Sequence, residues 1–239
     1  MKQKLLYRIP AVVLGLLCLG LVWADIEEVS NNRELAIVRR HIPSVFINNA
    51  ERNSAEIGTT LFDGDTLFTD ADGYALVMFM DQSITRVRPE SQLVIRGSVN
   101  ADQSTFTRID VNEGEIFLNV NRQGSSNVEV STTRSVASVK GTEFGARSTG
   151  FYWVEEGEVE VTARESGEVA SLTERMFAQV SLDGMDIETG ILTEAQLNNL
   201  ANDYQILNSD IIERKLRFRF MDENGQIREI ELDYYESEN

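Results

Sequence analysis

Short runs of alternating apolar and polar residues between residues 127 and 163 constrain the fold of this chain more than any other feature. Val128 and Val130 alternate with polar residues, and so do Val159 and Val161. Alternation with a period of two is typical of a strand with one buried and one solvated face. Gly, Ser and Thr separate the runs, as they do in turns. The stretch therefore predicts several short strands on a shared core.

The same pattern of short strand-like runs separated by turn residues extends over residues 57–184. Residues 74–80 are nearly all apolar, which predicts a strand buried on both faces. Residues 106–111 and 116–120 flank Glu113-Gly114, which predicts a β-hairpin. Roughly a dozen short strands at this spacing predict an all-β domain, either an antiparallel β-sandwich or a short β-solenoid.

A weak internal repeat lies within this region. Residues 111–116 and 154–159 both place Glu-Gly between apolar residues. A repeat of this kind favours a solenoid-like or double-layered form. The alternative is that two unrelated hairpins share the same turn chemistry, and two copies leave both interpretations open.

The region contains Lys140-Gly141-Thr142 with Phe144, followed by Glu156-Gly157 between apolar residues. The order of these pieces resembles the FecR domain family, which is named for a periplasmic regulator of iron-citrate transport. The resemblance covers roughly residues 58–184 and implies an extracytoplasmic β domain that serves envelope regulation or surface binding. The residues that match the family signature are Lys140, Gly141, Thr142, Phe144, Glu156 and Gly157.

We interpret these signature residues as structural. Gly141 is expected at a backbone position with positive φ or a close approach. Thr142 is expected to fix a turn, and Phe144 to pack in the core. No helix is expected directly after Lys140-Gly141-Thr142, so this stretch does not indicate a phosphate-binding loop.

The charge of the chain excludes nucleic acid as a partner. The formal net charge is −17, with 39 acidic against 22 basic residues. Phosphate binding requires clusters of Lys and Arg. The two Asp-Gly stretches at residues 63–65 and 70–73 are interpreted as turns rather than as a Ca²⁺ site, because the EF-hand pattern is not present.

The residue inventory disfavours catalysis. The chain has one histidine, His41, and one cysteine, Cys18. Ser-His-Asp and Cys-His sites and a His-ligated metal site are therefore not expected. We expect a protein that is not an enzyme and holds no cofactor, and the remaining catalytic alternative is a carboxylate-based hydrolase.

Residues 1–24 predict export. Lys2, Lys4 and Arg8 precede an apolar run from Ile9 to Ala24. This is the layout of a cleaved signal peptide. The alternative is an uncleaved anchor, although the run of 16 residues is shorter than the roughly 20 that span a bilayer.

Both alternatives place the bulk of the chain outside the cytoplasm, because basic residues precede the run and acidic residues follow it. The protein is expected to be periplasmic or secreted, or anchored in the inner membrane if the segment is retained. Membrane contact is expected only through this segment. About eight residues precede the run, so we expect no cytoplasmic anti-sigma segment of the kind that the family resemblance implies.

The ends of the chain differ from the middle. A short helix is expected over residues 27–41, and a strand over 44–47. Thr193 and Gln196 form a capping box that predicts a helix, and alternation around Asn224-Gly225 predicts a β-hairpin. The expected domains are a signal peptide or anchor at 1–24, a lead-in segment at 25–56, a FecR-like β domain at 57–184 and a helix-and-hairpin tail at 185–239.

Two features suggest an interaction surface. Alternation through residues 151–153 places at least one aromatic ring outward, so Trp153 is expected either to form a ligand platform or to pack against the tail. Arg217, Arg219 and Arg228 make the hairpin one of the few basic regions, and we expect it to pair with the strand edge of a partner. Deleting residues 190–239 is expected to leave the β domain folded and to abolish partner capture.

The expected function is that of an extracytoplasmic, non-catalytic module that binds another envelope or surface protein or glycan. The alternative is a component of a trans-envelope signalling pathway that regulates a sigma factor, which the family resemblance also implies.

Overall fold

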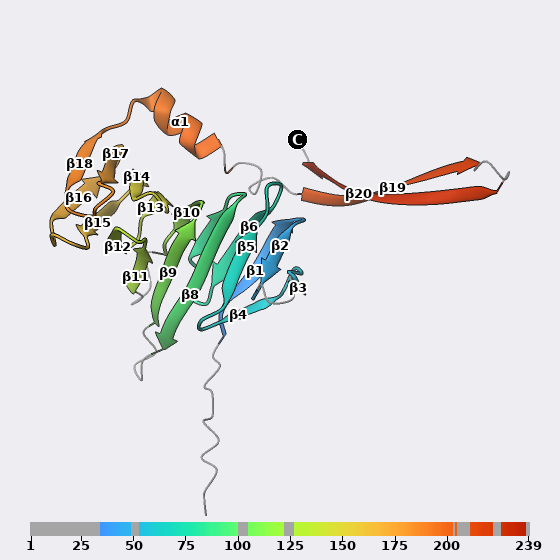
Figure 1. Ribbon diagram of the computed structural model, residues 1–239, viewed down its shortest axis with the longest axis horizontal. Helices are drawn as coiled ribbons and strands as arrows, with labels where there is room; N and C mark the ends of the chain where they lie inside the picture. The colour runs from blue at the N-terminus through green and yellow to red at the C-terminus, as the bar shows by residue number, and fades with distance from the viewer. Residues whose placement is uncertain are drawn as a thin grey trace, which may run out of the picture. The chain divides into compact units, whose positions relative to one another are not determined.

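Strands with alternating apolar residues form two open β-sheets that pack face to face, as Figure 1 shows. The computed structural model describes residues 34–48, 53–99, 105–121, 127–202, 204, 211–221 and 226–237. Within these ranges the fold is all-β with one short helix and a separate hairpin, which confirms the predicted fold class.

The first sheet, sheet A, contains nine of the described strands. In spatial order they are β18 (Ile187–Ile191), β17 (Met176–Val180), β14 (Phe151–Glu156), β13 (Glu143–Arg147), β10 (Glu115–Asn119), β7 (Ile84–Val87), β6 (Tyr74–Phe79), β1 (Glu34–Ile42) and β4 (Thr60–Phe62).

The second sheet, sheet B, also contains nine described strands. In spatial order they are β16 (Val169–Thr173), β15 (Glu158–Ala163), β12 (Ser135–Val139), β11 (Asn127–Ser131), β9 (Thr105–Glu113), β8 (Ser91–Val99), β5 (Thr66–Thr69), β2 (Val45–Ile47) and β3 (Asn53–Ser54). The pairings are antiparallel except that between β9 and β11, which is parallel.

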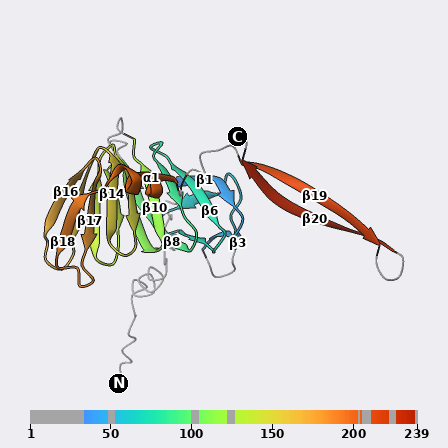
Figure 2. The same ribbon diagram turned by 90° about the horizontal axis from the view of Figure 1, so that it is seen from above.

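The chain advances along the sandwich while it passes between the layers. In both sheets the strand numbers rise from one end to the other, apart from an exchange within the first pair. Figure 2 shows the same progression as a colour sequence from blue at one end to orange at the other. The fold therefore combines the two layers of a sandwich with the stepwise progression of a solenoid.

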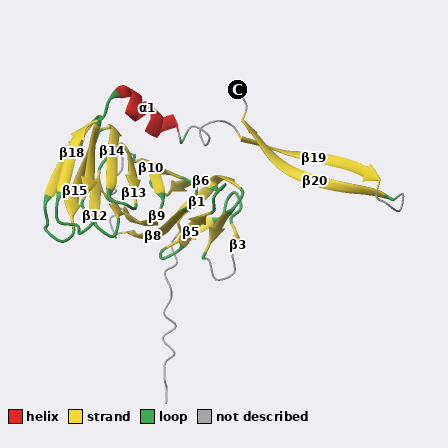
Figure 3. Cartoon of the chain, turned by 45° about the horizontal axis from the view of Figure 1, so that its top comes forward, coloured by secondary structure: helices red, strands yellow, loops and turns green. Residues whose placement is uncertain are grey.

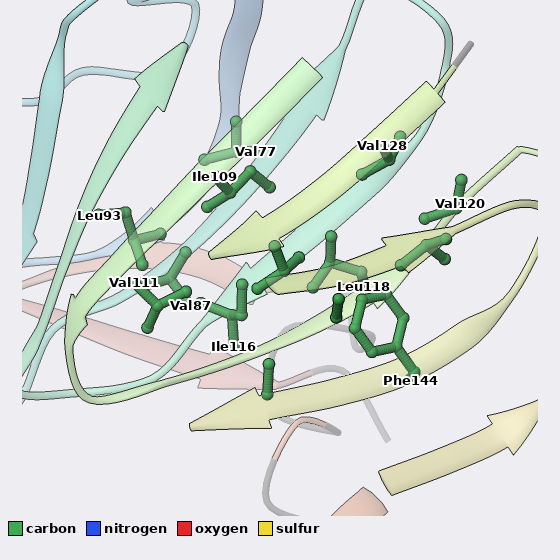
Figure 4. Close-up of a cluster of buried hydrophobic side chains, with 14 of the residues drawn as sticks. Val77, Val87, Leu93, Ile109, Val111, Ile116, Leu118, Val120, Val128 and Phe144 are labelled. Carbon is green, nitrogen blue, oxygen red and sulfur yellow. The ribbon is translucent and has the colours of Figure 1, made fainter. Parts of the chain in front are cut away.

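The inner faces of both sheets share one hydrophobic core, part of which Figure 4 shows. Phe144 contributes a fully buried ring from sheet A, and Ile109 a fully buried side chain from sheet B. Burying a side chain of this size contributes about 1.5–3 kcal/mol to folding. Other members of this core are Val77, Val87, Leu93, Val111, Ile116, Leu118, Val120 and Val128.

The hairpin predicted across Glu113-Gly114 is wrong. β9 pairs with β8 and β11 in sheet B, whereas β10 pairs with β7 and β13 in sheet A. Val111 before the turn and Ile116 after it are both buried in the shared core, and they enter it from opposite layers. The Glu156-Gly157 turn likewise joins β14 in sheet A to β15 in sheet B.

The helix predicted over residues 27–41 is also wrong where the structure describes it. Residues 34–42 form β1, which lies between β6 and β4 and buries Leu35, Ala36 and Val38. Two ladders of backbone hydrogen bonds outweigh the weak helical pattern, and β-branched side chains suit a strand. The strand predicted at 44–47 is confirmed as β2.

The boundaries predicted for the β domain change accordingly. β1, β2 and β3 lie before residue 57, and β18 lies after residue 184, yet all four belong to the two sheets. The sandwich therefore extends at least from Glu34 to Ile191.

The predicted tail elements are present. Helix α1 (Glu194–Asn202) begins with the capping box, because Thr193 N–H donates to Gln196 Oε1 at 2.9 Å and Gln196 N–H donates to Thr193 Oγ1 at 3.3 Å. β19 (Ile211–Met221) and β20 (Ile227–Ser237) form the predicted hairpin. The residues that the structure describes include no helix long and apolar enough to cross a membrane, and residues 1–24 lie outside them.

Replacing Phe144 with alanine should lower the free energy of unfolding by about 3–5 kcal/mol, because the change leaves a large cavity in the shared core. Chemical denaturation of the two proteins measures this difference. Lys140→Ala is the control, because Lys140 is exposed and its loss should change stability by less than about 0.5 kcal/mol. A loss below about 1 kcal/mol for Phe144→Ala would contradict the placement of this ring.

Candidate functional site

A hydroxyl clamp holds the family-signature turn together. Thr142 Oγ1 donates to the backbone carbonyl of Glu158 at 2.8 Å and accepts from its N–H at 3.2 Å. Gly157 has φ 94°, and a Cβ there would lie 2.9 Å from Thr142 Oγ1. Glycine is therefore required both by the backbone conformation and by the close approach of the threonine.

The same clamp occurs at the other Glu-Gly turn. Ser91 Oγ accepts from Glu115 N–H at 3.1 Å and donates to the Glu115 carbonyl at 3.4 Å. Gly114 has φ 79°, and a Cβ there would collide with Ser91. Ser91 begins β8, whose partner β9 leads into the Glu113-Gly114 turn. Thr142 directly precedes β13, whose partner β14 leads into the Glu156-Gly157 turn. In both strand pairs the register shifts close to the hydroxyl residue. The internal repeat thus describes two copies of one layer-crossing turn.

The remaining signature residues are placed as follows. Phe144 lies in the core, and Gly141 is buried with φ 65°, so both occupy the structural positions that their residue types suggested. Lys140 and Glu156 are exposed at the same end of the sandwich. The signature is therefore mostly architectural, with two charged side chains at the surface.

Trp153 does not belong to an interaction surface. Its side chain is fully buried, and it lies over Gly145, where any Cβ would collide with the indole ring. Leu197 and Leu200 of α1, which is red in Figure 3, pack against the cluster that contains Trp153. The prediction of an exposed ligand platform at Trp153 is therefore wrong. The alternative prediction, that Trp153 packs against the tail, agrees with its position beside Leu192 and Tyr204.

A buried carboxylate connects the tail to sheet A. Glu115, whose side chain is 9% exposed, forms an ion pair with Arg88 at 3.2 Å and another with Arg147. Tyr204 Oη, just beyond α1, donates to Glu115 Oε1 at 2.7 Å. Burial, and then the neighbouring carboxylate of Glu115, raise the pKa of Tyr204 well above its ordinary value, so the hydroxyl remains a donor.

Cations and aromatic rings continue this network across the outer face of sheet A. The Arg147 guanidinium lies 5.2 Å from the Phe151 ring centroid and 5.6 Å from that of Trp153. The Phe117 and Tyr204 ring centroids are 5.3 Å apart. These contacts are in the range of cation–π and aromatic pairs, so they stabilise the docking of the tail segment.

Sequence reasoning missed Glu115 and its arginine partners. Tyr204 lies in the cluster that contains Trp153, and Leu197 and Leu200 pack against that cluster. Glu115 is 89 residues away from Tyr204 in the chain, and no local pattern distinguishes it from the many solvated carboxylates. Only the tertiary fold brings the two together.

An open polar groove lies beside the signature turn. It has a volume of about 430 Å³ and is lined by Gln82, Asn119, Asn121, Thr142, Glu143 and Glu156. Asn119 Nδ2 donates to Glu143 Oε1 at 2.6 Å. Burial, and then the charge of Glu143, raise the pKa of the neighbouring Glu155, while Arg86 opposes this shift. The groove therefore presents hydrogen-bonding and acidic groups to solvent.

Both Asp-Gly stretches form turns, because Asp65 N–H donates to the Phe62 carbonyl at 3.1 Å and Gly73 N–H donates to the Asp70 carbonyl at 3.0 Å. Asp63 Oδ1 accepts from Gly97 N–H at 3.0 Å, and Asp65 Oδ2 accepts from Phe62 N–H at 2.8 Å. Asn48 Nδ2 also donates to Asp65, at 2.6 Å. These carboxylates thus stabilise backbone turns, which is the role that the sequence favoured over cation binding.

The three hairpin arginines do not form one basic patch. Arg217 and Arg219 lie on one face, where Glu229 Oε2 is 2.7 Å from Arg219 Nε and Glu229 Oε1 is 4.0 Å from Arg217 Nε. Arg228 is opposite Phe220 and so lies on the other face. The Glu229 carboxylate of β20 therefore faces both of these arginines.

Comparison with known proteins confirms the family resemblance over the centre of the sandwich. Residues 65–166 match the sequence model described as FecR protein, a narrower segment than residues 58–184. No curated protein matches the chain.

Two crystal structures of a protein from Parabacteroides distasonis ATCC 8503, provisionally named an anti-sigma factor, are similar to this chain. Each is 18% identical and covers 57% of the chain, with TM-scores of 0.47 and 0.46. The similar region is 63% and 64% of those two chains, which is less than two thirds of their length.

Thr142→Val should lower the free energy of unfolding by about 1–3 kcal/mol, because the N–H and carbonyl of Glu158 both lose the hydroxyl. Ser91→Ala should have a similar effect at the matching turn. Thr189→Val is the control, since Thr189 is an exposed threonine in a strand. Urea denaturation measures all three variants, and equal stability of Thr142→Val and Thr189→Val would rule out the clamp.

Tyr204→Phe should lower the free energy of unfolding by about 1–3 kcal/mol at neutral pH, because Glu115 loses a buried hydrogen-bond donor while the ring stays in place. The unfolded chain releases the tyrosine proton near pH 10, whereas the folded chain retains it. Stability from this group is therefore present below about pH 10 and is lost as the pH rises further. The difference in the free energy of unfolding between wild type and Tyr204→Phe should therefore narrow between pH 9 and about pH 11. A difference that stays constant over this range would contradict the raised pKa.

Proposed function

We propose, from the FecR domain at residues 65–166, that this chain is the extracytoplasmic part of a trans-envelope signalling pathway that regulates a sigma factor. The family match is the observation that carries the proposal. It favours signalling over the free-standing binding module that the sequence alone put first. Both functions require a partner, and signalling adds the requirement that partner binding changes gene expression.

The proposed role is non-catalytic. Most of the signature residues are occupied in holding the layer-crossing turn and the core, so they are not free to act on a substrate. Glu143 accepts a hydrogen bond from Asn119 at the rim of an open groove. A hydrolase built on carboxylates uses a pair that flanks a substrate in a cleft, so this arrangement favours recognition over hydrolysis.

We assign partner binding to the groove beside the signature turn. Glu143 and Glu156 line it, and polar amides from Gln82 and Asn119 add donors and acceptors. Acidic groups at a surface of an acidic chain favour a partner segment that carries Lys or Arg. A protein segment of that kind fits this groove better than an acidic glycan does.

The experiment is a complementation test in the native host. Deleting the gene should change the transcript levels of a defined set of genes that share one sigma factor, and the full chain should restore them. Glu156→Lys should restore expression several-fold less well, because it reverses the charge of the groove. Glu174→Lys is the matched control, since Glu174 is exposed in a turn and does not line the groove.

Unchanged transcript levels after deletion would overturn the signalling proposal. If the chain still bound an envelope protein under those conditions, the free-standing binding module would become the better description. Equal restoration by both charge variants would leave signalling standing and would reject the groove as its recognition surface.

A further inference from the structure

The hairpin of β19 and β20 forms a two-stranded sheet of its own. Its register runs without interruption from Ile211 opposite Ser237 to Met221 opposite Ile227. Among the described strands, these two pair only with each other. An isolated hairpin is marginally stable in water, and each of its outer edges presents unpaired backbone groups.

One face of the hairpin carries large apolar side chains that are open to solvent, beside Arg228. Phe218 lies opposite Ile230, and their side chains are 48% and 46% exposed. Phe220, two residues from Phe218, is on the same face and 46% exposed. The other face carries the Arg219–Glu229 ion pair. The ribbon is therefore amphipathic and needs a second layer or further strands to cover its apolar face.

The two strands carry opposite charge. β19 contains four basic residues and one acidic residue, for a net charge of +3. β20 contains one basic and four acidic residues, for a net charge of −3. The hairpin therefore has one basic edge and one acidic edge, although the chain as a whole is strongly acidic.

This charge distribution selects one mode of edge pairing. Two basic edges or two acidic edges would place like charges opposite each other, which destabilises strand pairs. A basic edge beside an acidic edge repeats the pairing that already occurs inside the hairpin. Both halves of the complementary pair are present in one chain, so a second copy supplies the partner without any other protein.

We infer that copies of this chain self-associate through their hairpins, with β19 of one copy beside β20 of the next. The contact joins unlike surfaces of two copies, so it can repeat until it closes into a ring. The apolar faces then lie side by side and cover one another inside the closed ribbon. This inference goes beyond the proposed function and does not depend on it.

A charge exchange tests the inference. The exchanged variant carries Lys215→Asp with Asp233→Lys, Arg217→Glu with Glu231→Arg, and Arg219→Glu with Glu229→Arg. Each of the three pairs lies directly opposite in the register, so the exchange preserves every pair within the hairpin. It reverses the charge of both edges, so an exchanged edge meets like charge on a wild-type partner.

Full chains with two different tags are coexpressed, and co-capture is measured for each combination. Wild type should capture wild type, and the exchanged variant should capture itself. Capture of wild type by the exchanged variant should be at least about tenfold lower, which corresponds to a difference of about 1.4 kcal/mol in binding free energy. Equal capture in all combinations would overturn the edge pairing and would indicate packing through the apolar faces.

A second variant guards against a hairpin that does not fold after the exchange. Deletion of residues 209–239 removes the hairpin and retains α1 and Tyr204. The native mass of the wild-type chain should be a multiple of one chain, and that of the deletion variant should be a single chain with the same unfolding free energy for the sandwich. A monomeric wild type, or a deletion variant that still self-associates, would overturn the inference.

Discussion

The structure depends on the passage of the chain between two sheets that share one core. At two matching turns a strand leaves one layer and enters the other, and apolar residues on both sides of the turn stay buried. A glycine with positive φ and a neighbouring hydroxyl that bonds both backbone groups of the next residue make this reversal possible. Most residues of the family signature form this layer-crossing turn or pack in the core beside it, which explains why they are mostly internal.

The second constraint is the buried carboxylate of Glu115. A charge in this position is costly unless it is paired and hydrogen-bonded. Two arginines and the Tyr204 hydroxyl supply those partners, and Tyr204 comes from the segment after α1. The helix therefore completes the outer face of sheet A rather than forming a separate tail. The matched segment at residues 65–166 is thus smaller than the folded unit to which it belongs.

Alternation and turn chemistry were sufficient to predict the fold class, the capped helix and the terminal hairpin. They failed where a decision depended on tertiary context. The alternation around Glu113-Gly114 fits a hairpin and a change of layer equally well, since both bury the same side chains. Residues 34–42 carry a weak helical pattern, but two neighbouring strands supply ladders that no local pattern reveals. Trp153 lies inward because Gly145 leaves room for its ring, and Glu115 is identified only by partners far away in the chain.

α1 and Tyr204 pack against sheet A and belong to the same folded unit as the two sheets. We expect the hairpin of β19 and β20 to add nothing to the stability of that unit, because it forms a sheet of its own. Two truncated chains separate these contributions to the free energy of unfolding. A chain that ends at residue 208 should unfold with the same free energy as the full chain. A chain that ends at residue 191 loses Leu192 and Tyr204, exposes Trp153 and leaves Glu115 without its hydroxyl donor, so it should be less stable by several kcal/mol, on the order of the loss of a buried core residue and a buried hydrogen bond. Equal stability of the two truncated chains would show that α1 and Tyr204 are not part of the folded unit.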